Sequence, residues 1–208
     1  MLHPHKNNLF IFLLLLLSIS SEATENPYDF IDENAQKMAD LLTYDSDLFK
    51  SDRQLYEEKI KEIFDPMIDF RRVSAMVMGK EHYMMATREQ RTKFVEVFRE
   101  SLLETYAETL AQWGNSKITT QFPEYYEPKN SNIVEVKQIL DTGNSKYPIS
   151  YKLRKNNEGW KIVNIIINGV NLGLTFRNQF ESLASANNND IDLTIENWVS
   201  DAGDAGIE

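Results

Sequence analysis

The sequence predicts a single α+β domain: helices first, then an antiparallel sheet of about four strands, then helices again. Two observations predict this order. Apolar residues recur at helical spacing through the first half of the chain and again near its end. Between about residues 117 and 167, apolar and polar residues alternate, and turn residues separate the runs. The sequence shows no internal repeat and no linker long enough to divide the chain.

Residues 1–23 are predicted to be a cleaved signal peptide. Lys6 precedes the apolar run "LFIFLLLLLSIS", and Ser21-Glu22-Ala23 is a small-x-small cleavage site. The alternative is a membrane anchor, but about a dozen apolar residues fall short of the roughly 20 that a spanning helix needs. We therefore expect the folded domain to occupy residues 24–201 and residues 202–208 to be frayed.

Four helices are predicted before the sheet. The first follows Asn26-Pro27, the second opens at the capping box Ser51-Asp52-Arg53-Gln54, and Asp65-Pro66 ends or kinks it. The third has Gly79 at its C-cap. The longest follows the capping box Thr87-Arg88-Glu89-Gln90 and closes at Trp113-Gly114. Apolar residues four apart form one stripe along it: Phe94, Phe98, Leu102, Tyr106 and Leu110.

The predicted strands are "KITTQF", with Ile118, Thr120 and Phe122 on one face, then "NIVEVKQIL", "KYPISYKLRK" and the run after Gly159. Pro148 lacks an N–H group, which favours an edge position for the third strand. Asn168-Gly169 ends the last strand. A helix over residues 172–184 and a short helix capped by Asp190 follow.

Little in the composition or the motifs indicates catalysis. The net charge of −10 argues against nucleic-acid binding, and the absence of cysteine excludes disulfides and thiol chemistry. No phosphate-binding glycine loop and no G-x-S-x-G motif is present. His82 is the only histidine after residue 23, and a lone histidine is more often structural. We predict no catalytic residue, no metal site and no enzymatic activity.

Apolar bulk is the more informative feature. The last strand carries Ile162, Val163 and Ile165–Ile167 on both faces, and four methionines lie between residues 76 and 85. This pattern fits either an ordinary core or a cavity, and the residues alone leave both open.

Four stretches, in order, resemble the MlaC family, also called the toluene-tolerance auxiliary family. They are "NPYDFIDENAQKMADLL", the segment from "FDPMIDF" to "YAETL", the signature "EGWKIVNIIINGVNLGLTFRNQF", and "DIDLTIENW". The resemblance covers most of residues 26–198. It departs from the family pattern at His82, which stands beside Tyr83 where two aromatic residues are common.

The resemblance implies a soluble periplasmic carrier without a cofactor, whose cargo is a phospholipid with two acyl chains in an apolar slot. It further implies transient contact with two membrane complexes. One is an outer-membrane lipoprotein and porin complex, and the other is an inner-membrane complex of an MCE protein with an ABC transporter. Such a shuttle would maintain the lipid asymmetry of the outer membrane.

We expect the slot to be lined from two helices and the sheet, by Val73, Val77, Phe98, Leu102, Tyr106, Ile149, Tyr151, Trp160 and Ile162. Arg177 is a candidate for a polar rim, and an ordinary surface salt bridge is the alternative. Two other functions stay open. One is a small-ligand enzyme on a cone-shaped sheet, for which His82 is the available imidazole. The other is a carrier of lipoproteins or apolar peptides.

Overall fold

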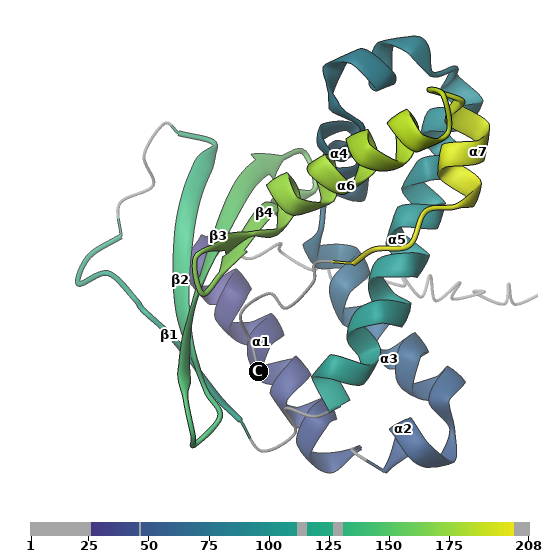
Figure 1. Ribbon diagram of the computed structural model, residues 1–208. Helices are drawn as coiled ribbons and strands as arrows, with labels where there is room; N and C mark the ends of the chain where they lie inside the picture. Colours follow the sequence, from purple (N-terminus) through teal and green to yellow (C-terminus); the bar gives the residue numbers. More distant parts are fainter. Residues whose placement is uncertain (1–25, 46, 112–115, 127–130, 202–208) are drawn as a thin grey trace, which may run out of the picture.

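The structure is a computed structural model that describes residues 26–45, 47–111, 116–126 and 131–201. Within these ranges, a five-stranded antiparallel sheet has its strands in sequence order, β1 to β5. The strands are β1 (Lys117–Thr120), β2 (Ile133–Asp141), β3 (Lys146–Asn156), β4 (Gly159–Ile167) and β5 (Val170–Asn171). Figure 1 shows the helices gathered on one side of this sheet, as expected for an α+β fold. The predicted signal peptide, the predicted frayed tail and Trp113-Gly114 lie outside the described residues.

The described helices are α1 (Pro27–Tyr44), α2 (Leu48–Ser51), α3 (Arg53–Met67), α4 (Phe70–Met85), α5 (Arg88–Ala111), α6 (Leu172–Ala186) and α7 (Ile191–Glu196). All but α2 begin at a residue whose side chain caps the first turn. Thr87 and Gln90 form the predicted reciprocal capping box at the start of α5. Asp190 accepts a hydrogen bond from the Leu193 N–H at the start of α7, also as predicted.

Two details of the predicted helices need correction. Asp52, not Ser51, caps α3, because the Asp52 carboxylate accepts the Leu55 N–H while Ser51 ends the short helix α2. Gly79 has the expected positive φ, at 71°, but α4 resumes after this kink and continues to Met85. α3 ends at Met67, one residue past Pro66.

The predicted edge position of the third strand is wrong. β3 is the central strand and pairs with both β2 and β4. Pro148 is tolerated there because its carbonyl accepts the N–H of Asn168, at the point where β4 has ended. In an antiparallel strand, the N–H and C=O groups of one residue point toward the same neighbouring strand. The N–H group that Pro148 lacks would therefore face the turn after β4, so no hydrogen bond between β3 and β4 is lost.

The first strand is shorter than predicted. β1 ends at Thr120, and Phe122 lies beyond it with 52% of its surface exposed. The last strand ends as predicted, because Asn168 and Gly169 both have positive φ and turn the chain into β5.

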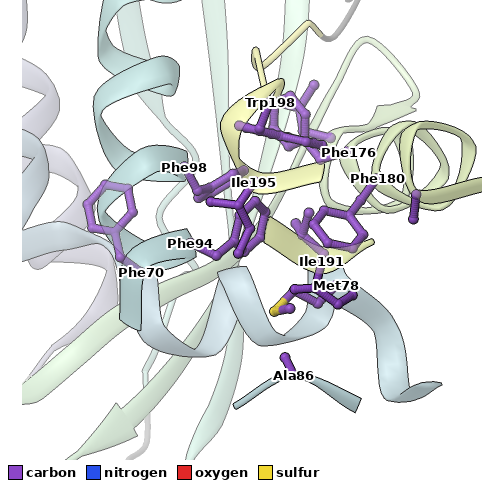
Figure 2. Packing of buried hydrophobic residues seen from close by; sticks show 13 residues of the cluster. Phe70, Met78, Ala86, Phe94, Phe98, Phe176, Phe180, Ile191, Ile195 and Trp198 are labelled. Atoms are coloured by element: carbon purple, nitrogen blue, oxygen red, sulfur yellow. The ribbon is translucent and has the colours of Figure 1, made fainter. Parts of the chain in front are cut away.

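The hydrophobic core consists of four clusters. Figure 2 shows the largest, where aromatic rings from α5, α6 and the segment after α7 point toward one another. The ring centroids of Phe94 and Phe180 are 4.9 Å apart, and those of Phe94 and Trp198 are 5.4 Å apart. A second cluster joins α1, α3 and α5, a third joins α1 to the sheet, and the fourth lies on β2 and β3. A domain of this size more often has one contiguous core.

Candidate functional site

The four clusters surround an apolar cavity with a volume of about 340 Å³. Its walls include Phe98 and Phe176 from the first cluster, Met38 from the second, Ile162 from the third and Ile149 from the fourth. The core is therefore divided because its clusters are the walls of a hollow between the sheet and the helices. The volume lies in the range of small-molecule binding sites, about 300–1,000 Å³.

The periodicity of each element places its cavity-lining residues. On α5, Phe98, Leu102, Tyr106 and Leu110 all line the cavity, because residues four apart share one helix face. Phe94, the first residue of the same stripe, is buried in the aromatic cluster instead. On β3, Ile149 and Tyr151 face the cavity from alternate positions.

Most of the residues predicted for the slot line this cavity: Val73, Phe98, Leu102, Tyr106, Ile149, Tyr151 and Ile162. Contact with lipid at these residues stays a prediction. Val77 and Trp160 are not among the lining residues. Val77 lies one turn beyond Val73 and is fully buried in the aromatic cluster. Trp160 pairs with Lys155 near the β3–β4 turn and packs in the cluster between α1 and the sheet.

Arg177 is not a lining residue either. Its Nε donates to Glu181 Oε1 at 2.9 Å in a surface salt bridge one turn along α6. The same guanidinium lies over Gly79, where an added Cβ atom would be 3.3 Å from Nε. The structure thus places Arg177 in the surface salt bridge that was the alternative to the polar rim.

Sequence reasoning missed the contribution of α1. Ile31, Ala35, Met38 and Leu42 line the cavity, and they are the residues whose spacing predicts the apolar face of this helix. The signal was therefore present, but the spacing does not tell whether that face meets a packed core or a hollow. Ile165 and Ile167 on β4 were missed for the same reason.

A few polar groups interrupt the apolar walls. Asn164 Oδ1 accepts the N–H of Gly173 at 3.1 Å, which ties β4 to the first turn of α6. A Cβ atom at Gly173 would lie 2.5 Å from this oxygen, so the contact requires glycine. Gln138 also lines the cavity, and its side chain is fully buried. Burial raises the pKa of the Tyr151 phenol well above its usual value.

The cavity is separate from His82, the one histidine among the described residues. His82 is not a lining residue; its Nδ1 is 3.2 Å from the Met78 carbonyl, and its ring stacks edge-on against Phe180.

Across the described ranges, no three His, Cys, Asp or Glu side chains gather in a way that could hold a metal ion. The arrangement suits the binding of an apolar ligand. In the same ranges, no helix has the length and hydrophobicity needed to cross a membrane.

The fold and the cavity define a class of protein, in which helices cover one face of an antiparallel sheet and enclose an apolar binding site. The MlaC protein family matches residues 32–200, and the chain belongs to this family.

Named relatives and a solved structure agree with this assignment. The chain is 27% identical to the toluene tolerance protein Ttg2D of Pseudomonas putida over 195 residues, which cover 94% of this chain and 90% of that protein. It is 23% identical to the intermembrane phospholipid transport system binding protein MlaC of Haemophilus influenzae, over 96% of this chain and 85% of that protein. A phospholipid-binding protein from Ralstonia solanacearum, solved in complex with a phospholipid, has a similar fold. Its TM-score is 0.72 at 22% identity, covering 81% of this chain and 92% of that one.

Proposed function

We propose that this protein binds a glycerophospholipid, with the acyl chains in the cavity and the head group outside, and carries it through the periplasm. The observation that carries the proposal is the apolar cavity of about 340 Å³ in a member of the MlaC family. The phospholipid bound by the similarly folded protein from Ralstonia solanacearum supports the choice of ligand.

The energetics of lipid transfer explain why the site needs shape and no catalytic groups. Two chains of about 16 carbons, at about 0.8 kcal/mol per CH₂ group, would cost more than about 20 kcal/mol to expose to water. The carrier must replace most of the apolar contact that the bilayer provides, because otherwise the lipid would not leave it. It must not exceed that contact greatly, because the lipid must also be released.

We further propose that the donor and acceptor are an outer-membrane lipoprotein and porin complex and an inner-membrane complex of an MCE protein with an ABC transporter. The names of the two relatives, which refer to phospholipid transport and toluene tolerance, support a role in the outer-membrane barrier. The apolar run at residues 9–20 supports export to the periplasm. The net charge of −10 disfavours lasting adsorption to anionic membrane surfaces, which suits transient contact with these complexes.

Mass spectrometry of gently purified protein tests the proposal, and we expect bound glycerophospholipid. Leu102→Asp places a charge in the wall of the cavity and should abolish lipid co-purification while the helix content survives. Leu174→Asp is the matched control, because Leu174 is 54% exposed on α6 and does not line the cavity. Lipid bound normally to the Leu102 variant would contradict the proposed site. A bound acylated polypeptide would favour the lipoprotein carrier, and the absence of any bound ligand would favour the small-ligand enzyme.

A further inference from the structure

The volume of the cavity limits how much lipid it can hold. In another protein, an apolar cavity of about 150 Å³ binds one benzene molecule, which has six carbon atoms. On the same scale of about 25 Å³ per carbon, a cavity of about 340 Å³ holds about 14 carbons. One acyl chain of a common phospholipid has about 16 carbons. The cavity therefore has room for most of one acyl chain and less than half of two.

The cavity is also long and narrow. Its lining residues on α5 run from Phe98 to Leu110, a length of about 18 Å along the helix. The volume divided by this length gives a mean cross-section of about 19 Å². A carbon chain that takes about 25 Å³ per carbon and advances about 1.2 Å per bond has a cross-section of about 21 Å². The length and the width of the cavity thus both match a single extended chain.

The walls of the cavity are also parts of packed clusters. Ile31 of α1 and Ile162 of β4 line the cavity and pack in the cluster that joins α1 to the sheet. Phe98 and Phe176 line it from the aromatic cluster, with their ring centroids 5.6 Å apart. Met38 lines it from the cluster between α1, α3 and α5. Widening the cavity means breaking contacts within or between these clusters, so a second chain carries a cost in free energy that the first does not.

We propose that the cavity in this structure is the binding site of a single acyl chain, and that the protein binds single-chain lysophospholipids without rearrangement. The proposal rests on the proposed function, because the same cavity holds the cargo with the head group outside. A two-chain phospholipid places one chain in this cavity, and its second chain requires the sheet and the helices to move apart. Lysophospholipids are then a second class of cargo for the same protein.

A chain-length series tests the proposal. Lysophosphatidylethanolamines with saturated chains of about 10 to 18 carbons, in steps of two, are titrated into delipidated protein in a calorimeter. The longer chains are measured in competition with the shortest, so that every lipid stays below its critical micelle concentration. The variant is Ala35→Leu, which adds three carbons to the cavity wall on α1. The control is Ala186→Leu, the same substitution at the exposed last residue of α6, which does not line the cavity.

We expect each added CH₂ group to tighten binding about fourfold while it enters the cavity. Above about 14 carbons the gain should fall below about twofold per CH₂ group, because the further carbons stay outside. Ala35→Leu should end the gain about three carbons earlier, because its side chain occupies that space. Ala186→Leu should keep the wild-type series. Should Ala35→Leu not fold by circular dichroism, Ala39→Leu provides the same comparison, because Ala39 also lines the cavity from α1.

Three results would overturn the proposal and leave the proposed function standing. One is a gain that continues undiminished to the longest chain, and another is an identical series for wild type and Ala35→Leu. The third is a protein that loads a two-chain phospholipid, as mass spectrometry would show, and binds no lysophospholipid. If the wild type bound neither kind of lipid, the proposed function itself would fail.

Discussion

Leu102 and Leu103 are neighbours on α5, and the structure predicts that their replacement by alanine has unequal cost. Leu103 is buried in the cluster between α1, α3 and α5, with 5% of its surface exposed. Leu102 packs on the edge of the aromatic cluster and borders the cavity. The helix, the residue type and the substitution are the same, so any difference comes from the surroundings of the side chain.

The expected magnitudes follow from what each side chain touches. Leu103→Ala removes three carbon atoms from a packed cluster, which loses about 2.4 kcal/mol in transfer free energy. The new void adds to that cost, so we expect a total of about 3–4 kcal/mol. Leu102→Ala enlarges a cavity that already exists, so the extra free-energy cost of creating a void is small. Only part of its surface lies against other side chains, and we expect about 1–2 kcal/mol.

Urea unfolding of delipidated protein, followed by circular dichroism, measures both free energies of unfolding. A second series with phospholipid present should narrow the difference between the two variants. A bound ligand stabilises the folded state by about 2.7 kcal/mol at 100 times its dissociation constant. Leu102→Ala should lose more of this stabilisation than Leu103→Ala, because only Leu102 lines the cavity. Equal costs without lipid, together with equal stabilisation by lipid, would refute the reasoning from the cavity.

Three further predictions concern stability. Gly79→Ala should cost about 1–3 kcal/mol in urea unfolding, because φ 71° and ψ 167° are unfavourable for alanine and Arg177 lies 3.3 Å from the added Cβ; an unchanged midpoint would contradict this. Asp190→Ala should cost about 1 kcal/mol by losing the cap of α7, whereas Asp190→Asn should retain most of it. Burial raises the pKa of Tyr56 to about 12. The unfolded tyrosine loses its proton near pH 10, so this residue's contribution to stability falls from pH 10 to 12. Tyr56→Phe should lessen that fall and leave the free energy of unfolding at pH 8 unchanged, because no described residue bonds the Tyr56 hydroxyl. Equal slopes of stability against pH for the wild type and the variant would argue against this.

The sequence by itself determined the elements whose signals are local. The capping box Thr87–Gln90, the cap at Asp190 and the Asn168-Gly169 turn each act through groups only a few residues apart. The four-residue spacing along α5 likewise identified the face that meets the cavity. These predictions succeeded because a cap or a turn needs only its own backbone geometry, and an apolar stripe needs only a helix.

The tertiary structure decided what each apolar face meets. Val77 and Trp160 are apolar at suitable positions, yet they lie in packed clusters, while Ile31 and Met38 of α1 line the cavity. Pro148 occupies a central strand because β4 ends beside it, a fact set by register and not by the proline. A cavity exists where distant elements fail to fill the space between them. Its position therefore depends on contacts across the whole fold, which no local pattern of residues contains.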